Sequence, residues 1–270
     1  MTRLLDADSR LRKLCLIKQN ESGYPRSVLS RFIRRVGEEN LLRIIQQKVV
    51  NLLVENGTSD VDAIFDASFI KAWSTRDPLD SQIGYSDNEA RVGRAGRTFG
   101  LGYKLHLSID SETMLPLACT FASANENEKK HSLNILEKSK LILKQSVAKL
   151  RSVIADSQYS DSKLRGTAGK AVITYPSNQK RGVKDVLRVD KKFRTYGPYD
   201  EKKEYHKRPH IEAVYSFLKT QYSLSVNKVR GLGNIACYAL FSLFCLVLNR
   251  EATQNFGRRD KAVSPTYFNA

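Results

Sequence analysis

The chain has 270 residues and a formal net charge of +17, from 45 lysines and arginines against 28 aspartates and glutamates. Its hydrophobic fraction of 41% is enough for a folded core, which excludes a disordered polycation and makes the charge a property of a folded surface. Such a surface favours DNA or RNA as a partner, but charge alone does not indicate catalysis, because structural RNA-binding proteins have the same balance.

Helices are predicted for the first 58 residues. A short helix is expected from about Ser9 to Gln19, and an arginine-rich helix from Ser27, its possible N-cap, to Val36, just before Gly37. This pattern resembles a DNA-binding helix-turn-helix, although a generic helical pair has the same pattern and is the commoner case. A third helix, Glu39 to about Glu55, is expected to pack on the next domain through Leu41, Ile44, Ile45, Val49 and Leu52.

Strands begin after residue 58. The segment Val61–Ala67 is a short, mostly apolar strand with Asp66 near its end, and Leu101–Ile109 alternates apolar and polar side chains as a half-buried strand does. Turn residues 110–113 and the segment Met114–Phe121 complete an antiparallel hairpin, in which Pro116 is typical of an edge strand. Three antiparallel strands are therefore expected first.

Helices and strands alternate in the next part of the chain. Asn125, with Glu128 three residues later, is expected to open a long helix whose inward residues are Leu133, Leu136, Leu143, Val147 and Leu150. A fourth strand, Arg151–Asp156, ends in an acid, and a short helix, Asp161–Ala168, and a fifth strand, Lys170–Tyr175, follow it.

This order of elements predicts an RNase H-like α/β fold, a mixed five-stranded sheet flanked by helices. We expect this fold to span residues 59–250, with a small all-α region in residues 1–58 and a loosely ordered tail in residues 251–270. In such a sheet the first and fourth strands are neighbours, so Asp66 and Asp156 should meet at one rim.

The segment from Tyr205 to Lys219 has the pattern Tyr-x2-Arg-x3-Glu-x6-Lys. Its apolar residues have helical spacing and form one stripe: Ile211, Val214, Tyr215 and Leu218. At about 100° per residue, Arg208, Glu212 and Lys219 lie together beside that stripe. Pro209 marks the first helical turn, which leaves Tyr205 in the preceding loop. Alone, the segment is an ordinary amphipathic helix with an i,i+4 ion pair.

Three acids that converge on one rim predict a metal site. Clustered carboxylates repel one another unless a cation offsets them, and a site with only oxygen ligands selects Mg²⁺ or Mn²⁺. Such ions activate a water or a 3′-hydroxyl and stabilise the leaving oxygen in phosphoryl transfer. Asp66, Asp156 and Glu212 are therefore the predicted catalytic and metal-binding residues.

Two basic segments are expected to face DNA. Residues 84–102 carry Gly93, Gly96 and Gly100 among several arginines, which predicts a mobile loop rather than a regular element. Between Lys180 and Arg208, lysines and arginines outnumber acids and alternate with aromatic residues. Cations with aromatics suit a nucleic-acid strand, and a solvated charged loop is the alternative.

One apolar stretch has the length of a membrane span. No charge occurs between Arg230 and Arg250, but small and polar residues interrupt the stretch, so we expect a helix buried in a globular core and no membrane partner. The four cysteines lack Cys-x-x-Cys spacing, and the N-terminus lacks a secretory signal. A cytoplasmic, nucleoid-associated protein is therefore expected.

The chain resembles the DDE transposases of prokaryotic insertion sequences, in the group with the Tyr-Arg-Glu-Lys signature. The resemblance extends over about residues 27–250. The segments that carry it are 65–68, 102–107, 115–118, 124–125, 155–159, 208–219 and 229–232.

This resemblance implies a transposase that cleaves DNA at the ends of its element and joins the freed 3′-hydroxyl to target DNA. Asp66, Asp156 and Glu212 would be the triad that binds Mg²⁺ or Mn²⁺. Six residues are expected to contact DNA, the first three near the scissile phosphate: Tyr205, Arg208, Lys219, Lys104, Arg97 and Arg230. The partners would be double-stranded DNA, both terminal inverted repeats and target, bound by a dimer.

Departures from the family pattern leave alternatives open. Glu128 stands where family members often carry Asp, and the larger β insertion of some relatives does not fit between Tyr175 and Tyr205. The alternative function is a catalytically inactive or truncated transposase-derived protein that binds DNA. A structural RNA-binding protein is a third hypothesis.

Three further residues have weaker functional patterns. His206 and His210 have the i,i+4 spacing of a zinc pair, but Pro209 lies between them and no third soft ligand is near, so solvated or phosphate-facing histidines are expected. Trp73 could stack on a flipped base, although a position in the core or at its rim is the simpler expectation.

Overall fold

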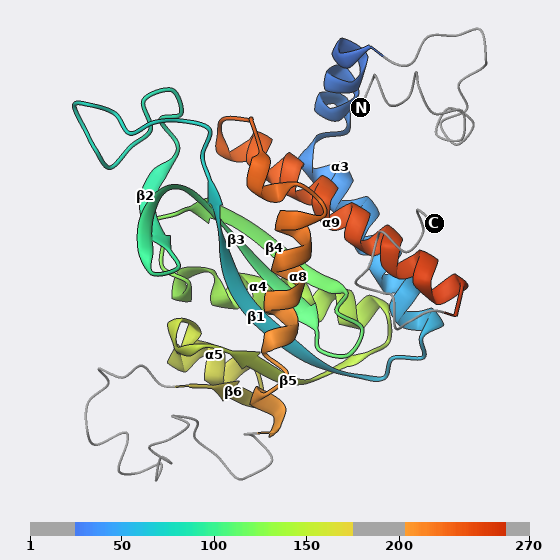
Figure 1. Ribbon diagram of the computed structural model, residues 1–270. Helices are drawn as coiled ribbons and strands as arrows, with labels where there is room; N and C mark the ends of the chain where they lie inside the picture. Colours follow the sequence, from blue (N-terminus) through green and yellow to red (C-terminus); the bar gives the residue numbers. More distant parts are fainter. Residues whose placement is uncertain (1–24, 175–202, 258–270) are drawn as a thin grey trace, which may run out of the picture.

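The computed structural model describes residues 25–174 and 203–257 (Figure 1). The helix predicted for Ser9–Gln19, most of the basic segment after Lys180 and the end of the predicted tail lie outside these ranges. The proposed helix-turn-helix therefore remains a prediction.

Helix α3 (Arg26–Glu55) consists of two helices joined at a kink. Gly37, with φ of 68° and ψ of 172°, interrupts it, which confirms the predicted end of the second helix and the third helix beyond it. Pro25, rather than Ser27, precedes the first turn, and no side chain caps it. Ile44 is 42% exposed, contrary to prediction, whereas the other four predicted apolar residues of the third helix are buried.

Six strands form one mixed sheet in the order β2-β3-β1-β5-β6, with β4 also paired to β3. Their bounds are β1 Asp60–Lys71, β2 Arg91–Ala95, β3 Thr98–Asp110, β4 Pro116–Ser123, β5 Lys149–Ala155 and β6 Ala171–Ile173. Strand β1 pairs antiparallel with β3 and parallel with β5, and β5 pairs parallel with β6. This is the predicted RNase H-like arrangement with one additional strand, β2.

Strand β2 corrects the prediction of a mobile loop in residues 84–102. It forms a hairpin with the start of β3, and the turn contains Gly96 at a φ of 65°. A Cβ on Gly93 would lie 1.9 Å from the main-chain oxygen of Ala124, and one on Gly100 would lie 2.8 Å from the ring of Phe69. Gly93 and Gly100 must therefore lack a side chain, because other parts of the protein pack directly against them.

Strand β3 is buried on both faces from Leu101 to Asp110, not half-buried as its alternation predicts. Helix α4 (Lys129–Gln145) covers the polar face, where the hydroxyls of Ser108 and Ser139 lie 3.0 Å apart. Helix α8 (Pro209–Thr220) lies on the opposite face of the sheet (Figure 1). The polar side chains of β3 thus contact other parts of the protein rather than solvent: Ser108 contacts α4, and Lys104 contacts the residues just before that helix.

Helix α4 differs from its prediction at both ends. Its N-cap is Glu128, not Asn125, and no side chain caps it. The helix ends at Gln145, so Val147 lies beyond it, 86% exposed, and Leu150 belongs to β5. The short helices η1 (Ser157–Tyr159), α5 (Ser162–Thr167) and η2 (Leu224–Val226) lie in connections between the larger elements.

The two C-terminal helices pack into the core. Helix α8 buries the predicted stripe of Ile211, Val214, Tyr215 and Leu218. Helix α9 (Leu232–Asn255) is long and apolar enough to cross a membrane, with a mean hydropathy of 1.8, but half of that apolar window is buried inside the protein. It lies along α3 (Figure 1), and its helical structure includes residues 251–255 of the predicted tail.

Candidate active site

Two aspartates lie where adjacent parallel strands stop pairing. Strand β1 pairs with β5 as far as Phe65 and Ala155, so Asp66 and Asp156 each follow the last parallel pair. Asp66 does not end its strand as predicted, because β1 continues to Lys71 in its pairing with β3. The two carboxylates nevertheless share one rim, where the charge of Asp156 helps to raise the pKa of Asp66.

Asp156 is held by the short turn that follows it. Its Oδ1 accepts a hydrogen bond of 2.9 Å from the main-chain N–H of Gln158. Tyr159, in the same turn, is fully buried, and its hydroxyl lies 3.0 Å from Nδ1 of His106 on β3. Burial and nearby carboxylates, first that of Asp66, raise the pKa of Tyr159 well above its usual value, so the phenol stays neutral beside the acids.

Helix α8 brings the third acid to the rim. Pro209 occupies the first helical turn, as predicted, and Arg208 immediately precedes it. Nη1 of Arg208 lies 2.9 Å from Oε1 of Glu212, and its Nη2 lies 3.7 Å from Oδ2 of Asp66. Arg208 is therefore the cation between the strand acid and the helix acid.

A buried tyrosine positions α8 against the rim. The hydroxyl of Tyr215 donates to the main-chain oxygen of Asp66 at 2.7 Å and also lies 3.1 Å from that of Leu105. These contacts hold the middle of α8 against β1 at Asp66, the predicted catalytic residue.

The rim carries more negative charge than its cations offset. Burial raises the pKa of Asp66 to about 6, against the opposing charge of Arg208, and the charges of Asp156 and Glu212 raise it further. Burial also raises the pKa of Asp156. Burial lowers the pKa of Lys219, and the charge of Asp66 acts in the other direction, so this lysine lies within electrostatic reach of the site. Such a balance is typical of a functional site.

Lys104, whose DNA contact stays a prediction, is buried. It is 7% exposed, and its Nζ lies 2.8 Å from Oε1 of Glu128 and 2.8 Å from the main-chain oxygen of Glu126. The Glu128 carboxylate is one of the charges that raise the pKa of Asp156. Lys104 therefore compensates an acid behind the rim.

The remaining predicted DNA contacts belong to three different segments of the chain. Arg97 is exposed at the tip of the β2–β3 hairpin. Arg230 is exposed and donates through Nε to the main-chain oxygen of Trp73 at 3.3 Å. Tyr205 lies before α8, but in a short helical segment rather than the predicted loop, and its ring packs on the core.

The two histidines do not form a metal site. Nδ1 of His210 lies 2.8 Å from the main-chain oxygen of Ser111. Within residues 25–174 and 203–257, no three His, Cys, Asp or Glu side chains are grouped closely enough to hold a metal ion. This result applies equally to Asp66, Asp156 and Glu212.

The residue types at the rim nonetheless fit a hard divalent cation. Asp66 and Asp156 provide carboxylate oxygens, which Mg²⁺ and Mn²⁺ prefer, and burial raises the pKa of Asp66, so a cation beside this carboxylate would favour its charged form. Glu212 is 56% exposed and paired with Arg208, so its side chain must leave that pair before it can act as a third ligand.

The profile of the transposase DDE domain family matches residues 57–248, most of the described core. The chain belongs to this family. The match runs from before β1 to within α9 and so includes the three predicted acids of this transposase domain. A search of curated proteins gave no significant match.

Solved transposase structures show distant similarity. A piggyBac transposase synaptic complex with hairpin DNA has 13% identity and a TM-score of 0.48, over 78% of this chain and 52% of the other. A Mos1 transposase paired-end complex with the left transposon end has 11% identity and a TM-score of 0.28, over 93% and 76% of the two chains. The chain thus spans about half the length of the piggyBac protein.

Sequence reasoning missed the residues that support the acids. Tyr159 and His106 fall within two of the segments that carry the family resemblance, but nothing in their spacing predicts their hydrogen bond. Tyr215 was predicted only as part of an apolar stripe. The departure at Glu128 marked one supporting residue in advance.

Proposed function

We propose that the protein is a DNA transposase that cleaves the ends of an insertion sequence in a metal-dependent reaction and transfers the freed 3′-hydroxyl to target DNA. The observation that carries this proposal is the under-compensated carboxylate of Asp66, next to Asp156 on adjacent parallel strands of the family's domain. The proposal also assigns the chain to the group with the Tyr-Arg-Glu-Lys signature.

The acids would hold the metal ions. Asp66 and Asp156 would bind Mg²⁺ or Mn²⁺ from the strands, and Glu212 would bind from α8. When bound, the ions supply activation of the attacking oxygen and stabilisation of the leaving oxygen. The buried phenol of Tyr159 keeps its proton at the rim and adds no negative charge to it.

Cations beside the acids would position the DNA backbone. Arg208 has a buried Nε without a hydrogen-bond partner among the described residues, and this N–H is directed at neither carboxylate. A phosphate oxygen is a suitable acceptor for it. Lys219 and Tyr205 would contact the same strand, and the release of Glu212 from Arg208 would couple phosphate binding to completion of the metal site.

The partners follow from this function. The chain would bind double-stranded DNA, first the terminal inverted repeats of its element and then a target, as a dimer that holds two ends. Its net charge of +17 favours association with DNA in the cytoplasm, at the nucleoid.

A cleavage assay tests the proposal. Duplex DNA that carries the terminal repeats of the element should be cut in Mg²⁺ or Mn²⁺ and not in EDTA. Asp66→Asn, Asp156→Asn and Glu212→Gln should each lower the rate by at least about a thousandfold, as expected for loss of a metal-binding charge. Lys144→Ala, which removes an exposed cation on α4, is the matched control. Wild-type cleavage by all three acid variants would refute the mechanism.

A second function has one observation in its favour. The described residues contain no ready three-ligand metal site, and Glu212 is paired with Arg208. A transposase-derived protein that binds DNA without cutting it would have these properties. Binding to the terminal repeats in EDTA, with no cleavage in either metal, would favour this function.

A further inference from the structure

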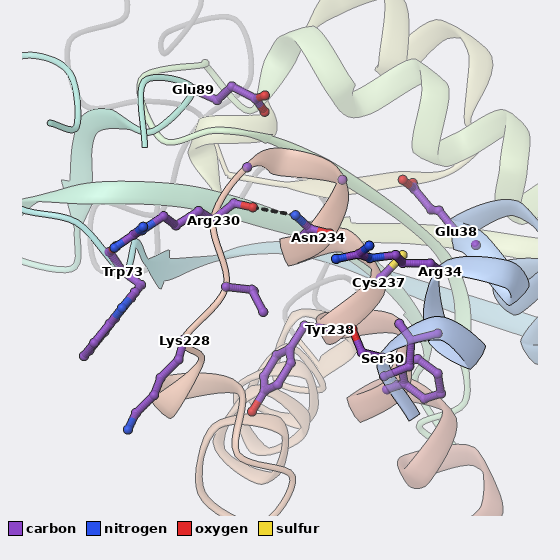
Figure 2. A pocket seen from close by; sticks show the side chains of 16 residues that line it. Ser30, Arg34, Glu38, Trp73, Glu89, Lys228, Arg230, Asn234, Cys237 and Tyr238 are labelled. Atoms are coloured by element: carbon purple, nitrogen blue, oxygen red, sulfur yellow. Dashed lines mark hydrogen bonds between the residues drawn. The ribbon is translucent and has the colours of Figure 1, made fainter. Parts of the chain in front are cut away.

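A groove separate from the acids lies between the first half of α3, the end of β1 and the start of α9. Its volume is about 1000 Å³. Trp73, Lys228 and Arg230 line one side of it, and Arg34 of α3 lies on the other, with Tyr238 of α9 between them (Figure 2). Aromatic rings and cations thus share one concave surface.

Hydrogen bonds hold one side of this groove in a fixed shape. Asn227 Nδ2 donates to the main-chain oxygen of Lys71 at 3.1 Å, and Arg230 Nε donates to that of Trp73 at 3.3 Å. Gly231, at a φ of 82°, then turns the chain into α9. The segment before α9 is therefore attached to the end of β1, and its cations are positioned before any ligand binds.

Two carboxylates also line the groove. Oε2 of Glu89 accepts a 2.7 Å hydrogen bond from the main-chain N–H of Leu232, so its charge is used at the start of α9. Glu38 is exposed. The three cations of the groove outnumber these acids, and the excess positive charge favours an anionic ligand.

The exposed tryptophan narrows the class of ligand. Trp73 is 49% exposed, and Nζ of Lys228 lies 5.6 Å from the centre of its ring. An exposed ring among cations is the combination that single-stranded nucleic acids use, because bases stack on the ring while phosphates meet the cations. The volume is that of a site for one small molecule, so it suits a few unpaired nucleotides rather than a duplex.

We propose that this groove binds an unpaired segment of the DNA strand whose cut end lies at the acids. Strand β1 continues from Asp66 to Lys71, a distance of about 17 Å, and Trp73 follows two residues later, so the groove lies a few nucleotides from the acids. The path of the strand from the acids rests on the proposed function, whereas binding of an unpaired strand in the groove does not.

The fluorescence of Trp73 tests this proposal directly. It is the only tryptophan in the chain, so its emission reports on the groove alone. In EDTA, a thymidine oligomer of about ten nucleotides should quench the emission to saturation, whereas a duplex of the same length should not. Unchanged emission, equal quenching by the duplex, or tighter binding of the matching uridine RNA would overturn the proposal.

Variants locate the binding energy. Trp73→Ala should weaken binding of a labelled thymidine oligomer by about 5-fold to 150-fold, the cost of one lost base stack, and Trp73→Phe should keep most of the affinity. Lys228→Ala and Arg230→Ala should each lower the slope of log affinity against log salt by about 0.7, while Lys144→Ala should not. Wild-type affinity in Trp73→Ala, or a wild-type salt slope in Lys228→Ala and Arg230→Ala, would contradict the proposal, and the two cation variants keep this test valid if Trp73→Ala fails to fold.

The same set of proteins separates this proposal from the proposed function. Quenching by the oligomer in a chain that cuts no DNA would refute the transposase activity and support the groove. Cleavage by the wild type together with unaltered oligomer binding by Trp73→Ala, Lys228→Ala and Arg230→Ala would refute the groove alone.

Discussion

Two aspartates on β1, Asp62 and Asp66, have opposite environments although they lie four residues apart. Asp62 is fully buried and accepts hydrogen bonds from Arg151 and Ser152, and Lys207 Nζ lies 3.0 Å from its Oδ2. These contacts overcome the cost of burial and hold its pKa below the usual value of 3.8. Asp66 has one cation at 3.7 Å, and burial raises its pKa to about 6.

The difference separates a structural acid from a functional one. A buried charge whose partners are all present is compatible with a stable fold. A buried charge that lacks partners is stabilised when a ligand of opposite charge binds beside it. Burial alone does not distinguish the two residues, because both are mainly inside the protein. What distinguishes them is the number of donors directed at each carboxylate.

The largest expected effect is on the structural acid. Asp62→Ala should lower the free energy of unfolding by about 3 kcal/mol, because it leaves the buried hydroxyl of Ser152 without its acceptor and removes the ion pairs with Arg151 and Lys207. Urea denaturation at pH 7 measures this change. Asp60→Asn, at the exposed start of the same strand, is the control and should have almost no effect. Equal stability of Asp62→Ala and wild type would contradict the conclusion that Asp62 is a structural acid.

The opposite sign is expected for Asp66. The difference between 3.8 and about 6 corresponds to about 3 kcal/mol, so Asp66→Asn should raise the free energy of unfolding at pH 7 by up to that amount. Denaturation of the metal-free protein in urea tests this. A destabilised Asp66→Asn would show that the carboxylate is satisfied in the native state.

The pH dependence of stability should show the same contrast. Because the folded pKa of Asp66 is raised, its protonated form favours the folded state, and this contribution is lost as pH rises from about 4 to about 6. Asp62 acts in reverse, since its contribution is present above about pH 4 and is lost below it. Unfolding between pH 3 and 7 should give a flatter curve above pH 4 for Asp66→Asn than for wild type.

Divalent metal should change the stability of the wild type by a smaller amount. At a Mg²⁺ concentration ten times the dissociation constant, binding to the folded state should add about 1.4 kcal/mol. Asp66→Asn should lose this gain while Asp60→Asn keeps it. Thermal unfolding with and without Mg²⁺ measures the effect independently of cleavage, and an equal shift in both variants would indicate nonspecific ion binding.

The smallest expected effect is that of Glu212→Gln without metal or DNA. The pair with Arg208 is an exposed i,i+4 pair, so its loss should change the free energy of unfolding by less than about 0.5 kcal/mol. The same variant should lose DNA cleavage. A large loss of stability would mean that Glu212 is a structural residue like Asp62.

Sequence periodicity predicted the parts of this protein that depend on local spacing. The buried stripe of α8, the adjacency of Asp66 and Asp156, and the kink at Gly37 all follow from residue order, because helix and strand periods are properties of the backbone itself. The ends of helices were less predictable, as Ser27 and Asn125 show, since side chains suited to capping do not always cap.

Tertiary structure alone decided which charges are compensated. The sequence contains Asp62, Asp66 and Lys104 without any sign that the first is saturated, the second is not, and the third is buried against Glu128. The partners of each lie far away in the chain, and their distances depend on how sheet and helices pack. The close approach that requires Gly93 has the same origin. Local pattern therefore determined the elements and their order, and contacts between distant segments determined the chemistry of the site.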